Sequence, residues 1–206
     1  GTVSVTGLAT LGGTQVTSGG AQTYGANVVM QDSGGVFGFN STLGGTGASI
    51  SFAGTLTSPT TKALTLNAGT TGDVSLATAL ANTATYTDVT VTGANLSLQA
   101  VAATTSVAFN PTVSGTVGVV SGVSATLTKG AAGVMNLTAD NTYGGNTTVS
   151  AGTLTLSGTG NLGAGTYAGN IAISSGAVLQ DSASTAQTLS GIISGAGQVR
   201  KDTSSS

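Results

Sequence analysis

The chain has 206 residues and a formal net charge of −2, with four Lys or Arg residues, six Asp and no Glu or His. Four cations are too few to form a surface that binds the phosphates of a nucleic acid or of an anionic membrane. No apolar run reaches the ~18 residues of a membrane-spanning helix. Because Cys is also absent, disulfides, thiolate metal sites and the usual zinc and copper ligands are excluded, and we expect neither a metal nor a cofactor.

The composition and the spacing of turn residues predict an all-β chain in which no strand is long. Val and Thr favour a pleated backbone, and Gly, Asn or Asp closes an apolar stretch about every 8 to 12 residues. Three short strands are expected in residues 1–17, and a glycine corner, Tyr24 and a strand in 19–31. Further short strands are expected within 36–40, 48–54, 62–69, 72–78, 87–100, 105–115 and 116–130.

The stretch 127–158 then shows the pattern most clearly. Alternating runs at 134–138 and 153–157 flank a corner made of Asn141, Thr142, Tyr143 and paired glycines. Because successive side chains of a strand point to opposite faces, the apolar residues share one face and the hydroxyls the other. The stretch therefore predicts a strand, a corner and a strand with one buried side.

Three observations favour a β-solenoid over a β-sandwich. The inward candidates are mostly Ala, Val and Leu, which cannot fill the ~10 Å layer between two packed sheets. Segments resemble one another, as 19–24 resembles 185–191 and 66–76 resembles 135–149, and such repetition is typical of stacked architectures. Residues 187–201 resemble the start of a further repeat, with Lys201 in the place of Lys129.

The pattern in 127–158 resembles the autotransporter-associated β-strand repeat, which occurs in passenger regions of bacterial surface proteins. Ala131 and Ala139 stand where that repeat usually has Gly, and residues 19–115 resemble repeats of filamentous-haemagglutinin-type exoproteins more loosely. The matching positions, which we treat as repeat-defining, are Leu127, Lys129, Gly133, Met135, Leu137, Asn141, Thr142, Tyr143, Gly145, Thr147, Val149, Gly152, Thr153 and Leu154.

This resemblance implies a right-handed parallel β-helix that is secreted and displayed on the surface of a Gram-negative-type bacterium. Stacking at about 4.8 Å would close a narrow core and pair each coil with its neighbours. We expect one solenoid domain over residues 1–202, made of roughly ten short coils, followed by a flexible tail at 203–206.

The residues whose side chains are capable of catalysis or ligand binding are interpreted as structural. No catalytic residue is expected, because paired carboxylates are missing and the six Asp lie far apart in the sequence. Asp32, Asp73 and Asp140 are expected in Asx-turns, with calcium binding by one of them as the alternative. Asparagines also recur near corners, where we expect them to form turns or to stack into amide ladders, with ligand contact as the alternative. They are Asn67, Asn82, Asn95, Asn110 and Asn141.

Aromatic, basic and threonine positions complete the set. Phe37 and Phe39 are expected in the core, with an exposed adhesive strip as the alternative. The four tyrosines are expected at corners with wet hydroxyls, where a ring could also stack on carbohydrate. Lys129 and Lys201 are interpreted as charges at coil edges that discourage lateral pairing. Thr-x-Thr pairs such as those at 90/92 and 153/155 resemble ice-binding solenoids only if they align on successive coils.

Two non-enzymatic functions follow from these features. The first is a rod-like stalk or adhesin passenger segment of a longer surface protein, in contact with a host, surface or matrix glycan or protein. The second is a filament subunit that polymerises end to end, because an uncapped solenoid end leaves a row of unpaired backbone groups. Nucleic acid and membrane insertion are not expected in either case.

Overall fold

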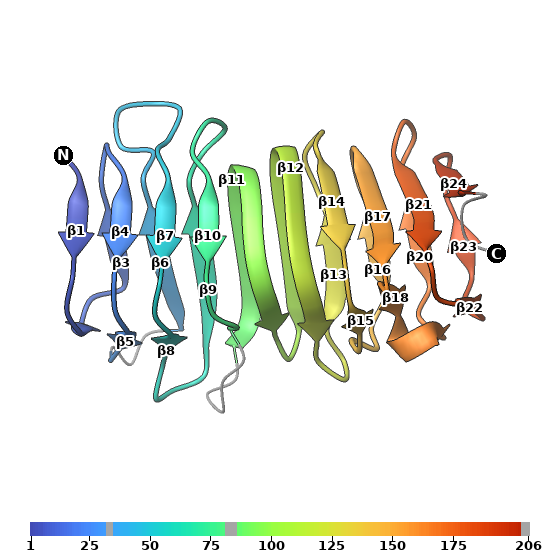
Figure 1. The fold of residues 1–206 in the computed structure, drawn as a ribbon, viewed down its shortest axis with the longest axis horizontal. Helices are drawn as coiled ribbons and strands as arrows, with labels where there is room; N and C mark the ends of the chain where they lie inside the picture. The colour runs from blue at the N-terminus through green and yellow to red at the C-terminus, as the bar shows by residue number, and fades with distance from the viewer. Residues whose placement is uncertain (32–34, 81–85, 203–206) are drawn as a thin grey trace.

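In a computed structural model, the chain forms a right-handed parallel β-solenoid of about nine turns, with 56% of its residues in strands. The structure describes residues 1–31, 35–80 and 86–202. The coils stack along one axis, and the two termini lie at opposite ends of the stack (Figure 1). The predicted fold class is confirmed, with about nine turns where roughly ten coils were expected.

The strands form three stacks, which we call columns 1, 2 and 3. Column 1 is the most regular, and each of its strands pairs in parallel with the strand one turn away. Its members are β1 (Val3–Val5), β4 (Gln22–Tyr24), β7 (Ile50–Phe52), β10 (Val74–Leu76), the middle of β11 (Tyr86–Ala102), the middle of β12 (Ser106–Ser121), β14 (Val134–Leu137), β17 (Thr153–Gly158), β21 (Val178–Ala183) and β24 (Gln198–Lys201).

Columns 2 and 3 complete each turn. Column 2 contains β3 (Gln15–Thr17), β6 (Val36–Asn40), β9 (Lys62–Asn67), the first parts of β11 and β12, β13 (Thr126–Lys129), β16 (Thr147–Val149), β20 (Ile171–Ile173) and β23 (Ile193–Ser194). Column 3 contains β2 (Ala9–Leu11), β5 (Val28–Met30), β8 (Leu56–Thr57), the last parts of β11 and β12, the pair β15 (Asp140–Asn141) and β18 (Asn161–Leu162), the short helix η1 (Gly163–Gly165), and the pair β19 (Thr166–Tyr167) and β22 (Thr188–Leu189).

Two strands in the middle of the rod are long, which the sequence did not predict. β11 has 17 residues and β12 has 16, and each passes through consecutive columns. Their pairing continues around a corner because the register shifts at a bulge between Gly93 and Asn95. Such a bulge bends a strand without ending it, so the turn residues there do not separate two strands.

The core consists of inward side chains that align from coil to coil. One aligned row in column 1 contains Leu96, Gly115 and Met135 in successive turns. A Cβ atom on Gly115 would lie 2.5 Å from Met135 Sδ, so the methionine occupies the space that the glycine leaves. The core is therefore thin but complementary in shape, as close packing requires.

All four phenylalanines are buried, which confirms the core prediction for Phe37 and Phe39. Near the N-terminal end, the rings of Phe39 and Phe52 meet edge to face, with their centroids 4.9 Å apart, and Tyr24 stacks on Phe52 at 4.7 Å. Such ring contacts stabilise the fold by more than the burial of their apolar area alone.

The tyrosine prediction was wrong, because all four rings are buried together with their hydroxyls. Tyr24 Oη donates to Gln22 Oε1 at 3.2 Å, and Tyr86 Oη donates to the Leu56 carbonyl at 2.9 Å. Each hydroxyl thus has a partner inside the core, which removes the cost of burying it. No tyrosine ring face is available for stacking on carbohydrate.

The threonine pairs do not form an array across coils. Thr90 and Thr92 are followed in the next turn by Ala108 and Asn110. The pair at 153 and 155 is followed by Val178 and Gln180. The aligned Thr-x-Thr surface on which an ice-binding interpretation depends is therefore missing at both pairs.

Candidate functional site

The repeat-defining residues lie mainly inside the rod, around the corners of adjacent coils. The buried ones among these fourteen positions are Leu127, Lys129, Gly133, Met135, Leu137, Asn141, Tyr143, Thr147, Val149 and Leu154, whereas Gly145, Gly152 and Thr153 are half-buried and Thr142 is exposed. A set that is mostly buried cannot form a ligand surface. The structure therefore gives this pattern a structural role, in which it closes a coil and stacks it on the next one.

The three glycines of the pattern stand where two coils approach closely. A Cβ atom on Gly133 would lie 2.6 Å from the Pro111 carbonyl oxygen, and one on Gly145 would lie 2.5 Å from that of Ala125. Gly152 also has a φ of 66°, which side-chain-bearing residues rarely adopt. Only glycine fits these corners without displacing the preceding coil.

Lys129 is buried in the core and does not lie at a coil edge, so the predicted edge role is wrong. Its Nζ donates to the carbonyls of Gly130, Ala131 and Ala151, the last two at 3.0 Å. In column 2 it aligns with Phe109 on one side and Val149 on the other. Burial lowers the pKa of this ammonium to about 8. The side chain turns back to satisfy carbonyl groups at two corners.

Lys201 is not equivalent to Lys129, which corrects the predicted alignment of the two repeats. Ile193 pairs with Ile171, which assigns β23 to column 2 and the following strand β24 to column 1. Lys201 therefore continues the inward row of Leu137 and Leu156, after Asp181. The similar sequences around the two lysines therefore lie on different sides of the coil.

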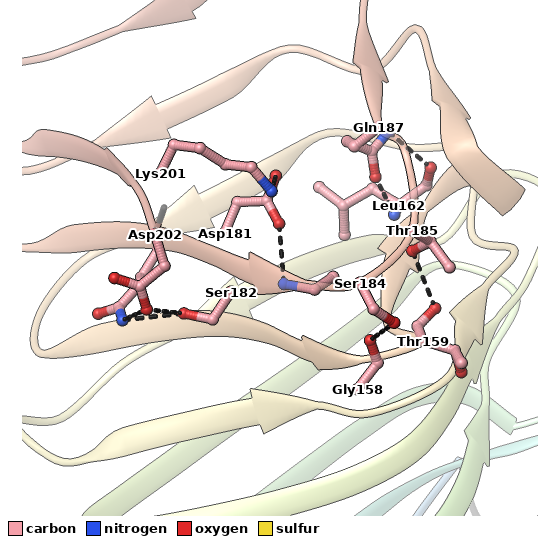
Figure 2. Close-up of polar contacts among 12 residues, drawn as sticks. Gly158, Thr159, Leu162, Asp181, Ser182, Ser184, Thr185, Gln187, Lys201 and Asp202 are labelled. Carbon is pink, nitrogen blue, oxygen red and sulfur yellow. Dashed lines mark hydrogen bonds and ion pairs between the residues drawn. The ribbon is translucent and has the colours of Figure 1, made fainter. Parts of the chain in front are cut away.

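The last two coils replace apolar inward residues with an ion pair. Lys201 Nζ lies 3.0 Å from Asp181 Oδ2, with the lysine about half exposed (Figure 2). Beside it, Asp202 accepts hydrogen bonds from Ser182 Oγ at 2.6 Å and Gln180 Nε2 at 3.1 Å, which lower the pKa of its carboxyl. Charged side chains at inward positions are a known protection of an edge against further strand pairing.

A chain of buried hydroxyls connects two coils near Tyr143. Thr147 Oγ1 lies 2.7 Å from Tyr143 Oη and 2.7 Å from Tyr167 Oη, and Tyr167 Oη donates to the Gly145 carbonyl. Burial raises the pKa of both phenols, most strongly that of Tyr143. The chain of hydroxyls ends at a backbone carbonyl, so it fixes the corner of the coil.

Amide side chains replace backbone groups in column 3, where the strands are shortest. Asn141 Oδ1 accepts from the Val120 amide at 2.8 Å, and its Nδ2 donates to the Asn161 carbonyl at 2.9 Å. Gln187 does the same for Leu162, whose N–H and C=O both bond to the glutamine amide (Figure 2). Gln187 was not among the predicted residues, although a lone Gln among small residues was a signal for it.

The predicted asparagines belong to several rows and do not form one ladder. Asn67 aligns with Asn40 in the preceding coil and Thr92 in the next, and Asn110 follows Thr92. Asn95 belongs to column 1 and donates to Asp73 Oδ1 from both its backbone and its side chain. Asn82 lies outside the described residues.

The aspartates bond mainly from coil to coil, which corrects the Asx-turn prediction for two of them. Asp73 accepts from Asn95, and Asp140 accepts from Asn161 Nδ2 at 2.7 Å. Asp181 alone among these three carboxylates accepts a local amide, that of Ala183. Asp32 lies outside the described residues. Within the described ranges, no three His, Cys, Asp or Glu residues lie close enough to hold a metal ion.

No protein-family model, curated protein or solved structure matches this chain. In the part of the chain that the structure describes, no helix has the length and apolar character needed to cross a membrane.

The corner at Ala131 generates a first prediction, because this alanine has a left-handed φ of 52° whereas Ala139 has an ordinary φ. Ala131→Gly should raise the free energy of unfolding by roughly 0.5–1 kcal/mol, since glycine adopts this conformation without steric cost. Ala139→Gly should lower it by a similar amount, because glycine there only increases the entropy of the unfolded chain. Urea denaturation measures both, and equal effects of the two variants would contradict the assigned corner geometry.

The buried Lys129 generates a second prediction. Its pKa falls from 10.5 to about 8 on folding, so between these values the unfolded state binds more protons and stability rises with pH. Above about pH 10 the buried tyrosines oppose this trend, because burial raises the pKa of Tyr24 to about 12. We therefore expect the urea midpoint to increase between pH 8 and pH 10.

Lys129→Met should abolish that increase, whereas Lys201→Met should retain it, because Lys201 is half exposed. A rise of the same size in all three proteins would show that Lys129 is not its source.

Proposed function

We propose that the chain is a non-enzymatic structural rod, which acts as a stalk or passenger segment of a secreted bacterial surface protein. The observation that carries this proposal is the continuous parallel stacking of about nine turns between termini at opposite ends (Figure 1). The resemblance of residues 127–158 to a passenger-associated repeat supports the secreted location.

The construction suits a spacer. At about 4.8 Å per turn, nine turns separate the ends by roughly 40 Å. Each coil is held to the next by backbone hydrogen bonds, by aligned core residues and by cross-coil bonds such as those of Asn141 and Gln187. A load along the axis is thus shared by every column.

The chemistry of the interior supports a role without catalysis. The perturbed groups Lys129, Tyr143 and Tyr167 are all engaged with partners inside the rod. Their altered pKa values arise from burial, which structural networks produce as readily as active sites do.

The proposal predicts that, in the producing cell, this sequence lies within a much longer polypeptide that is accessible from outside. Surface biotinylation of intact cells followed by mass spectrometry should recover peptides from this chain, and an antibody against it should detect a band far above 19.4 kDa. A cytoplasmic protein control must remain unlabelled. A mature protein that ends at Ser206, or one labelled only after lysis, would contradict the stalk.

A second candidate is a subunit that polymerises end to end, and the apolar residues at both end coils favour it. Leu8 is 69% exposed at the first coil, and Ile192 is 70% exposed at the last. In a head-to-tail joint, continuation of the column 1 register would place Val199 over Val3 and Lys201 over Val5. The first contact is apolar, and the second opposes assembly because it would desolvate an ammonium.

This candidate predicts filaments with an axial repeat of roughly 40–45 Å by electron microscopy of the concentrated 206-residue chain. Lys201→Leu should increase their number, and Val5→Lys should suppress them. Monomers at every concentration in light scattering, for the wild type and for Lys201→Leu, would exclude filament formation and leave the stalk unaffected.

A further inference from the structure

A hollow on the outer face of column 2 takes part in neither of these roles. It has a volume of about 340 Å³ and lies across β3, β6 and β9. Its lining residues are Thr14, Gln15, Val36, Gly38, Phe39, Asn40, Thr65 and Asn67. None of them is charged, and most end in a hydroxyl or an amide.

The hollow exists because one residue in an outward row lacks a side chain. Gln15, Gly38 and Thr65 align in three successive turns. A Cβ atom on Gly38 would meet only Gln15 Cγ, at an ordinary contact distance of 3.7 Å. Neither a close approach nor a left-handed φ requires glycine at this position, unlike the corner at Gly152.

Two asparagines beside the hollow are held by their own turns. Asn40 Oδ1 accepts from the amide and hydroxyl of Thr42 at 2.9 and 2.7 Å, and Asn67 Oδ1 accepts from the Gly69 amide at 3.0 Å. The two residues are aligned neighbours on β6 and β9. Because each carbonyl oxygen is engaged, each amide is oriented with its Nδ2 donors left over.

These donors are not used within the described part of the chain, nor are the side chains of Gln15 and Thr65. The wall therefore offers oriented donors from two asparagines, a glutamine amide and a hydroxyl. Val36, which is 55% exposed, adds an apolar patch at the rim.

This chemistry selects a neutral, hydroxylated ligand. A charged ligand would lose hydration against a wall that carries no opposite charge. A sugar hydroxyl both donates and accepts, and it can match amide and hydroxyl groups in one arrangement. We propose that the hollow binds a neutral saccharide unit, which accepts hydrogen bonds from Asn40 Nδ2 and Asn67 Nδ2 and packs its C–H face near Val36.

The surface beyond the hollow favours a saccharide within a chain. From Thr65 and Asn67 the two outward rows continue in register to Thr90 and Thr92 on β11. This strip is also uncharged and polar. A linear glycan that lies along the rod axis would thus place one unit in the hollow and the next ones on the strip.

The test uses the ¹⁵N-labelled 206-residue chain and a panel of neutral disaccharides, namely maltose, cellobiose, lactose and chitobiose, with galacturonic acid as the charged comparison. At least one neutral disaccharide should shift the side-chain amide resonances of Asn40 and Asn67, saturably and in the millimolar range. Galacturonic acid should shift them less.

Gly38→Thr fills the hollow and should weaken binding at least tenfold while the thermal midpoint stays within a few degrees of wild type. Ala172→Thr makes a matched change on the same outward row, several coils away, and should leave binding unchanged. Gln15→Ala should also weaken binding, because this side chain lines the hollow and makes no hydrogen bond to another residue that the structure describes.

No shift with any neutral disaccharide at about 50 mM would overturn the proposal. A shift of equal size in Gly38→Thr would overturn it too. Either result leaves the rod function intact, because that function is measured by surface exposure and polypeptide length.

Discussion

The structure depends on backbone pairing between successive coils, which is parallel and in register along the rod. No single coil can satisfy its own N–H and C=O groups or bury its own apolar side chains, so each coil requires its neighbours. This constraint explains why glycine occupies corners at which two coils approach closely, as Gly145 does beside the carbonyl of Ala125. It also explains why the side-chain amides of Asn141 and Gln187 form hydrogen bonds with backbone groups in column 3, where the strands are short.

Register also decides the chemical character of each position. A residue on an inward row becomes part of a continuous core, whatever its polarity, and must find partners there. Lys129 does so with three carbonyls, and Tyr143 and Tyr167 do so through the hydroxyl of Thr147. The perturbed pKa values of these groups follow from this confinement.

Residues on the outward rows are not constrained in this way. Nothing in the stacking requires a particular side chain there, so a single change alters the surface without altering the fold. Gly38 is such a case, because it opens a hollow that a threonine would fill without strain. A rod whose interior carries the structure can thus present recognition on one face, and a stalk and a saccharide-binding surface are compatible roles for one chain.

Alternation, turn spacing and small apolar residues are enough to predict a thin β-solenoid, because these side chains cannot fill the thicker core of a sandwich. The sequence also placed Phe39 in the core and Gly145 at a corner. The side of the coil on which each segment lies could not be predicted, because the similar sequences around Lys129 and Lys201 are compatible with two different sides. Only pairing with the preceding turn distinguishes them, and that pairing is a contact between residues about 20 positions apart.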